Sequence, residues 1–222
     1  MAAAARAGEA APRQAQALRG QIGRYYTDQL DAHGPTPRGV DWSCASSQHL
    51  RFAQLLRICE PARKKFSLND FGCGYGELLR HLGGAPSTTA KIDYLGIDLS
   101  PTMVEAARRL HPDAAFAAGH TSPRTADYTV ASGVFNVKLR CGQARWIRHI
   151  EDCLRQLFET SRHGLAFNLL APWPAHMAQS SALFRAQPQP WIAFCEEALG
   201  GQVELLAGYG LGEYTLLVRR SR

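Results

Sequence analysis

A glycine-rich segment and a later aspartate carry the strongest chemical signal in the sequence. The segment, residues 70–76, reads DFGCGYG and follows a short apolar run. Glycines at this spacing allow a sharp strand-to-helix turn and let a ligand approach the backbone closely. Asp98 ends the next β-rich run, 22 residues after Gly76, and an acid ~20 residues beyond such a turn reaches ribose hydroxyls in a doubly wound sheet. The two features together predict a single ligand site.

Two common nucleotide-binding motifs are absent. A dinucleotide fingerprint G-x-G-x-x-G needs a small residue at position 77, where the sequence has Glu77, and the third glycine comes one residue early, at Gly76. The phosphate loop G-x-x-x-x-G-K-[ST] is absent as well, because neither Gly72 nor Gly74 is followed at that distance by Gly-Lys. The sequence therefore disfavours a nicotinamide site and ATP chemistry.

The two features resemble the class I S-adenosylmethionine-dependent methyltransferases, with D-x-G-C-G-x-G after the first strand and G-I-D-x-S at the end of the second. The resemblance is strongest over residues 67–109 and weaker over residues 126–135 and 164–172. More loosely, the chain looks like small stand-alone bacterial members. The resemblance implies the cofactor S-adenosyl-L-methionine and an α/β fold, in which a Rossmann-like, seven-stranded, mostly parallel sheet has an antiparallel last strand and N-terminal covering helices.

The same resemblance assigns cofactor contacts. The glycine-rich segment would line the methionine half of the cofactor, and Asp98 would bind both ribose hydroxyls. The family usually has an acid or amide after the third strand for the adenine amino group, whereas residues 118–121 read AGHT, so His120 or the backbone would have to serve. Arg51 could pair with the cofactor carboxylate, unless it is an exposed helix arginine. The expected cofactor-binding residues are Asp70, Gly72, Cys73, Gly74, Gly76, Asp98, Leu99, His120, Ser132 and Arg51.

The acceptor site has no strong motif, and none is expected. Methyl transfer from a sulfonium is an in-line displacement, so the protein mainly holds the two reactants collinear and needs a base only if the acceptor retains a proton. Residues 132–136 follow the predicted fourth strand, and ligands bind beyond the carboxyl ends of such strands. The catalytic candidates are Asn136, Lys138 and His33, although a capping asparagine and a surface lysine are equally plausible readings. The substrate-binding candidates are Tyr25, Tyr26, Asp41, Trp42 and Asn168.

Alternating β-rich and helical periodicity predicts the elements that position these residues. The predicted strands are residues 66–71, 94–99, 114–118, 128–135, 165–170, 202–207 and 213–219. The predicted helices are residues 14–32, 47–59, 76–82, 101–110, 146–163 and 191–199. Ser100 is the predicted N-cap of the fourth helix, with Pro101 in its first turn. The short connection at residues 208–212 requires a hairpin, and therefore one antiparallel strand.

The remaining segments read as connectors and a tail. Residues 33–42 form a Pro/Gly-rich connector that could close over the site, and residues 171–190 are a candidate loop or lid. Residues 1–13 read as a frayed, alanine-rich tail. We expect one structural domain, with a tail and covering helices at residues 1–65 and the Rossmann-like methyltransferase domain at residues 66–222.

Composition limits the class of protein. The chain has 222 residues, of which 45% are hydrophobic and 20% charged, so it can bury a core. No apolar run approaches the ~18 residues of a membrane span. The six cysteines form no C-x-x-C pair and no cluster with histidines at zinc-ligand spacing. We therefore expect reduced thiols, a cytoplasmic protein, no metal site and no membrane.

The net charge of +6 suits an anionic partner, but basic residues gather only at positions 63–65 and at the C-terminus. The sequence also lacks the Asn/Asp-Pro-Pro-Tyr/Phe arrangement of enzymes that methylate amino groups of nucleic acids. A small polar molecule, methylated on O or N, is therefore the expected acceptor, and nucleic acid is not expected as a partner. An RNA methyltransferase and a non-catalytic cofactor-binding subunit are the alternatives, and a homodimer is left open.

Overall fold

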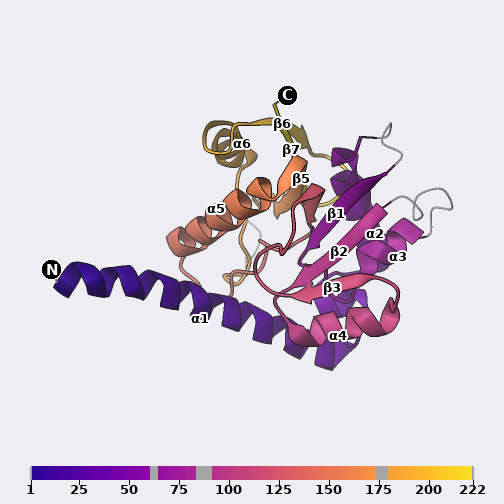
Figure 1. Cartoon of the computed structure of the whole chain (residues 1–222), viewed down its shortest axis with the longest axis horizontal. Helices are drawn as coiled ribbons and strands as arrows, with labels where there is room; N and C mark the ends of the chain where they lie inside the picture. The colour runs from indigo at the N-terminus through magenta and orange to yellow at the C-terminus, as the bar shows by residue number, and fades with distance from the viewer. Residues whose placement is uncertain (1, 61–64, 84–91, 174–179, 222) are drawn as a thin grey trace.

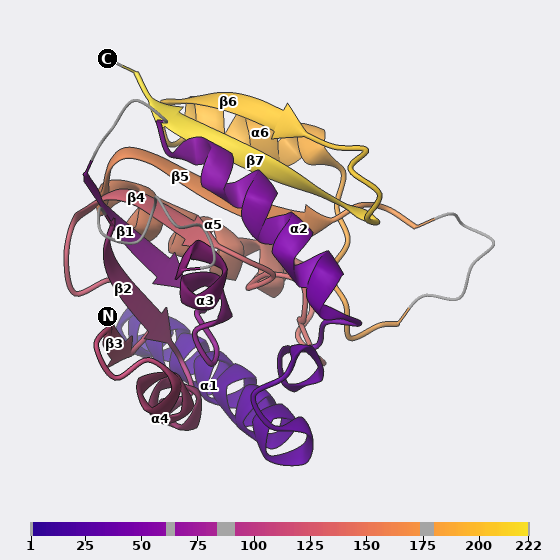
Figure 2. The same cartoon turned by 90° about the vertical axis from the view of Figure 1, so that its right-hand side faces the viewer.

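The computed structural model describes residues 2–60, 65–83, 92–173 and 180–221. Its strands form one seven-stranded sheet in the order β3-β2-β1-β4-β5-β7-β6, with helices on both faces (Figure 1, Figure 2). The strands are β1 (Phe66–Phe71), β2 (Ile92–Asp98), β3 (Ala115–Ala118), β4 (Ala126–Ala131), β5 (Ser161–Leu170), β6 (Gly201–Leu206) and β7 (Glu213–Arg220). The helices are α1 (Ala2–His33), α2 (Ala45–Leu55), α3 (Glu77–Gly83), α4 (Pro101–Leu110), α5 (Gln143–Glu159) and α6 (Pro188–Glu197), with short 3-10 turns η1 (Pro37–Val40) and η2 (Leu56–Ile58).

Strand pairing confirms the predicted topology. β1 pairs in parallel with β2 and β4, β3 with β2, and β5 with β4. β7 is antiparallel to both β5 and β6, as the short connection between the last two strands requires. The carboxyl ends of β1, β2 and β4 therefore lie at one edge of the sheet, where ligands bind in doubly wound folds.

Two apolar cores hold the helices against the sheet. On one face, Leu18 and Ile22 of α1 join Trp146 and Ile150 of α5 in a buried cluster with strand residues. On the other face, α2, α3 and α4 contribute to a second cluster. The helices before β1 thus pack directly on the sheet, as predicted, while the division of the chain at residue 65 stays a prediction. No helix of the described residues is long and apolar enough to cross a membrane.

Local signals correctly predicted α4 and the carboxyl-terminal half of β5. The Ser100 hydroxyl accepts a hydrogen bond of 3.2 Å from the Met103 backbone N–H, and Pro101 starts the helix, so the predicted N-cap is confirmed. The central residues 164–169 of β5 are all buried. This burial agrees with the continuous apolar run there, because a strand covered on both faces needs no polar side.

Several predicted boundaries are wrong. The helix predicted over residues 146–163 ends at Glu159, and β5 begins at Ser161 instead of residue 165. α1 already begins at Ala2, so residues 2–13 are helical instead of a frayed tail, in line with the high helix propensity of alanine. β4 ends at Ala131 instead of Phe135 because the chain turns at Gly133, whose φ is +73°. α6 begins at Pro188, where proline fits a first helical turn, so the candidate lid at residues 171–190 is shorter than predicted. Residues 174–179 of that segment lie outside the described residues.

Candidate active site

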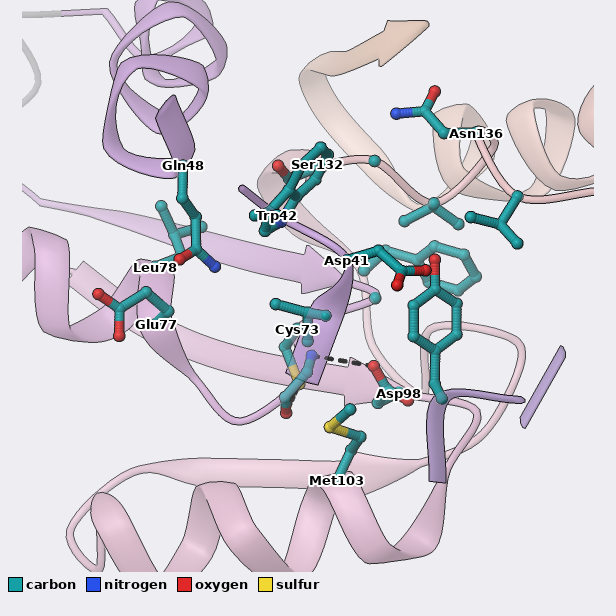
Figure 3. A pocket seen from close by; sticks show the side chains of 18 of the residues that line it. Asp41, Trp42, Gln48, Cys73, Glu77, Leu78, Asp98, Met103, Ser132 and Asn136 are labelled. Atoms are coloured by element: carbon teal, nitrogen blue, oxygen red, sulfur yellow. Dashed lines mark hydrogen bonds between the residues drawn. The ribbon is translucent and has the colours of Figure 1, made fainter. Parts of the chain in front are cut away.

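A cavity of about 290 Å³ lies at the carboxyl ends of β1, β2 and β4. Asp70 and the following glycine turn, Asp98, and Ser132 to Val134 line its floor, and residues of α1, α2 and the connector between them line its other side. Figure 3 shows Asp98 and Met103 on one side of the cavity and Ser132 and Asn136 on another, with Asp41 between them. The cavity therefore joins the predicted cofactor site to the predicted acceptor site.

The glycine turn after β1 brings backbone to the cavity. Gly72 and Gly74 both line it and have φ values of +76° and +54°, which favour glycine over any residue with a Cβ. A Cβ at position 72 would also lie 2.5 Å from the Cγ2 of Val134. The Gly72 backbone N–H donates to the Ile97 carbonyl at 2.7 Å, which fixes the turn against the end of β2.

Asp98 is fixed by backbone donors. Its Oδ2 accepts a hydrogen bond of 2.9 Å from the Gly74 N–H (Figure 3), and its Oδ1 accepts one of 2.8 Å from the Ser100 N–H. Burial raises the pKa of Asp98, and the backbone donors oppose that rise. Each carboxylate oxygen can accept more than one hydrogen bond, so the group retains acceptor capacity toward the cavity. A pair of hydroxyls on one ligand would match it.

Asp70 is a second buried carboxyl on the floor of the cavity. It is buried at the end of β1, and its Oδ2 accepts a hydrogen bond of 2.7 Å from the Tyr94 hydroxyl. Burial raises the pKa of Asp70 to about 7, while the Tyr94 bond lowers it. A cation bound in the cavity would favour the charged form of this carboxyl.

Several buried polar atoms along the cavity have no hydrogen-bond partner among the described residues. They are Nη1 of Arg51, Oγ of Ser132 and both amide atoms of Asn136, and all three residues line the cavity. Asn136 is only 4% exposed. Buried polar groups in native proteins are nearly always paired, so these atoms fit a site whose bound molecules supply the missing partners.

A buried polar network supports the acceptor side of the cavity. The Arg51 Nε donates to Glu213 Oε2 at 2.7 Å, and Glu213 Oε1 accepts from the Asn168 amide at 3.1 Å. The Asn168 Oδ1 in turn accepts from the Gly133 N–H at 2.7 Å. The Arg51 guanidinium also lies 3.9 Å from the centroid of the Trp42 ring. The network therefore ties α2 and the connector before it to the turn after β4.

The structure brings most of the predicted site residues to the cavity. Those that line it are Tyr26, Asp41, Trp42, Arg51, Asp70, Gly72, Cys73, Gly74, Asp98, Leu99, Ser132 and Asn136. Their contacts with cofactor or acceptor stay predictions.

Six predicted residues do not line the cavity: Tyr25, His33, Gly76, His120, Lys138 and Asn168. His33 and His120 are exposed, and Gly119 lines the cavity in place of its neighbour. The Lys138 Nζ donates to the Cys141 carbonyl at 3.3 Å, and the Tyr25 hydroxyl donates to Asp41 Oδ2 at 2.7 Å. Both amide atoms of Asn168 form hydrogen bonds within the buried network, to Gly133 and Glu213, so Asn168 supports the site without lining the cavity.

Some lining residues were not predicted from the sequence. Gln48 is buried on α2 and accepts a hydrogen bond of 3.4 Å from the Tyr75 hydroxyl. Arg185 comes from the segment after β5, and Glu77 and Met103 come from α3 and α4. None of these residues lies in a recognised motif.

Comparison with known proteins defines the class. Residues 69–157 match the family described as methyltransferase domain. Rv1506c of Mycobacterium tuberculosis (strain ATCC 25618 / H37Rv), a candidate methyltransferase, is 40% identical over 163 residues, which make up 72% of this chain and 96% of the relative. The chain therefore belongs to the S-adenosylmethionine-dependent methyltransferases, as the sequence resemblance indicated.

Solved structures share the fold at low identity. Magnesium protoporphyrin IX methyltransferase of Synechocystis PCC 6803, solved with S-adenosylhomocysteine, is similar with a TM-score of 0.63 at 11% identity, over 93% of this chain and 99% of that one. CalS10 of Micromonospora echinaspora, an amino pentose methyltransferase solved with S-adenosylmethionine, has a TM-score of 0.57 at 15% identity, over 77% of this chain and 88% of that one. Together they establish the class I methyltransferase fold.

Proposed function

We propose that this protein transfers a methyl group from S-adenosylmethionine to an oxygen or nitrogen of a small polar molecule. The observation that carries the proposal is the position of Asn136, a buried amide without a partner among the described residues, in the same cavity as Asp98 and the glycine turn. A cavity that served the cofactor alone would have no need of such an amide on the side away from Asp98.

The residues on the floor of the cavity fit the cofactor. Asp98 would accept hydrogen bonds from the ribose hydroxyls, the backbone at Gly72 and Gly74 would face the methionine half, and Asp70 would lie near its positive charges. The bound cofactor supplies an electrophilic methyl carbon, which forms a bond to the acceptor atom as its bond to sulfur breaks and the electron pair stays on sulfur. If the acceptor atom carries a proton, that proton passes to solvent water.

The chain's main contribution on the acceptor side is position. Trp42 packs against the turn after β4, since a Cβ at Gly133 would lie 2.3 Å from its Cζ2. Asn136 would orient the acceptor by its amide, and the apolar side chains of Val137 and Leu183 would keep water out. Holding two reactants collinear in this way is worth several orders of magnitude in rate, on the order of 7–11 kcal/mol at best.

Product analysis tests the proposal. The protein is incubated with methyl-labelled cofactor and a protein-free extract of the source organism, and products are followed by mass spectrometry. We expect a small molecule that gains the mass of one methylene group. Label that appears only in RNA added to the same assay would instead support the nucleic-acid alternative, and cofactor binding without any labelled product would support a non-catalytic subunit.

A further inference from the structure

Arg185 is a cation of the cavity lining that the sequence did not predict. It lies in the segment that returns along the end of β5, where it forms a β-bridge with Leu170. Its Nη1 donates to the Ala171 carbonyl at 2.9 Å, and its guanidinium lies 4.4 Å from the centroid of the Trp173 ring. Both contacts hold the side chain in place, but neither neutralises its charge.

The returning segment places Arg185 beside Asn136. The Phe184 backbone N–H donates to the Asn136 carbonyl at 2.8 Å, and Val137 bridges to Leu183. Four residues of these two paired segments line the cavity and form one wall of it: Asn136, Val137, Leu183 and Arg185. This wall therefore contributes both a guanidinium and a buried amide without a partner among the described residues.

The cavity lining contains four carboxylates and two arginines. The lining carboxylates Asp41, Asp70, Glu77 and Asp98 come from the connector, β1, α3 and β2. Each accepts hydrogen bonds from other groups: Asp41 from Tyr25, Asp70 from Tyr94, Glu77 from Arg80 and His49, and Asp98 from backbone N–H groups.

The two lining arginines differ in whether a carboxylate neutralises their charge. Arg51 forms an ion pair with Glu213, so its charge is compensated inside the protein. Arg185 forms no ion pair with any described residue. Burial lowers the pKa of Arg185 with no opposing carboxylate, which is the pattern of a guanidinium that has lost water and gained no counter-ion.

We propose that the acceptor is an anion, a small molecule with a carboxylate or phosphate group that binds Arg185, with Asn136 of the same wall as a second hydrogen-bond partner. A guanidinium fits a planar or tetrahedral oxyanion through two N–H groups at once. An anionic acceptor would also be attracted by the positive sulfonium across the cavity. This inference rests on the proposed function, because it specifies the acceptor of the same reaction.

Fractionation of the extract before the reaction tests the charge of the acceptor. The protein-free extract is passed over an anion exchanger at neutral pH, and the retained and unretained fractions are each incubated with the full-length protein and methyl-labelled cofactor. We expect the retained fraction to support transfer. Transfer from the unretained fraction alone would overturn the anionic acceptor and leave the proposed function intact, whereas no transfer from either fraction would contradict both.

Substitutions of Arg185 test whether this residue binds the anionic group of the acceptor. With the active fraction as substrate, Arg185→Gln should raise the half-saturating amount of acceptor about tenfold or more, since a hydrogen bond to a charged group is lost. Arg185→Lys should retain part of the binding, and cofactor affinity should stay unchanged in both variants. Arg148→Gln, at an exposed position of α5, is the matched control. Equal acceptor saturation in Arg185→Gln and Arg148→Gln would overturn the role of Arg185, whatever the charge of the acceptor.

Discussion

The Gly74 backbone N–H donates a hydrogen bond of 2.9 Å to the Asp98 carboxylate, which joins the turn after β1 to the end of β2. Two sequence features that are 24 residues apart thus form one structural unit. The contact also orients the carboxylate, because its other oxygen is held by the Ser100 N–H at 2.8 Å. A carboxylate that is fixed at both oxygens loses little conformational entropy when it accepts hydrogen bonds from the hydroxyls of a ligand.

Asp98→Ala should weaken both S-adenosylmethionine and S-adenosylhomocysteine. Loss of a charge-assisted contact costs about 1.5–3 kcal/mol, or roughly ten- to hundredfold in Kd. Titration calorimetry measures the change, and Asp113→Ala, at an exposed position, serves as control. Unchanged affinity in a folded Asp98→Ala variant would contradict the ribose assignment.

Asp70 should make the protein less stable as the pH rises. Burial raises the pKa of Asp70 to about 7, whereas an unfolded aspartate has a pKa of ~3.9. Between these values the folded carboxyl keeps a proton that the unfolded one has lost, so the free energy of unfolding falls with rising pH. Asp70→Asn removes this contribution, and its stability relative to the wild type should increase between about pH 4 and pH 7.

Urea denaturation of both proteins across that range measures the effect. Asp113→Asn provides the comparison for an exposed aspartate. If the free energies of unfolding of Asp70→Asn and the wild type changed in parallel with pH, the buried carboxyl would already be ionised at low pH.

Local sequence was sufficient to predict the glycine turn and the position of Asp98 beside it. The glycine turn needs positive φ at Gly72 and Gly74, and few other residues tolerate such a backbone. Asp98 ends a parallel strand next to β1, so topology alone brings it to the turn. Backbone conformation and strand order can both be inferred from the sequence, and together they bring these residues to one end of the sheet.

The acceptor side depends on contacts between segments that are far apart in the chain, and such contacts have no local sequence pattern. Arg51 and Glu213 are 162 residues apart in the chain, and nothing near either residue indicates the pairing. Asn168 looked like an acceptor contact because it lies near the end of β5, yet tertiary structure turns it toward Gly133 and Glu213. Arg185 was missed because its position follows from how the segment after β5 returns to the sheet.

The Arg51–Glu213 pair should be important for folding. The Glu213 side chain is 0% exposed and that of Arg51 only 9%, so removal of either charge leaves the other buried without compensation. Glu213→Gln should lower the free energy of unfolding by about 3–5 kcal/mol. Glu204→Gln breaks an ion pair with Arg57 whose side chains are 46% and 54% exposed, and it should cost about 1 kcal/mol or less.

Denaturation of the two variants under the same conditions gives the comparison. The double variant Arg51→Met/Glu213→Gln should recover much of the lost stability, because it leaves no unpaired buried charge and keeps an acceptor for the Asn168 amide. Similar stabilities for Glu213→Gln and Glu204→Gln would mean that water reaches the buried pair.

Asn136 should show opposite effects on stability and on turnover. Its two amide atoms are buried without partners among the described residues, and an unsatisfied buried polar group costs about 1–3 kcal/mol. Asn136→Leu, of similar shape, removes that cost, so the free energy of unfolding should stay equal or rise by about 1 kcal/mol. Turnover should nevertheless fall, because the acceptor loses its hydrogen-bond partner, while cofactor affinity stays within about threefold. Denaturation, calorimetry with S-adenosylhomocysteine and the labelled-transfer assay measure the three quantities. A variant with lower stability and full turnover would show that the amide serves the fold and has no part in binding the acceptor.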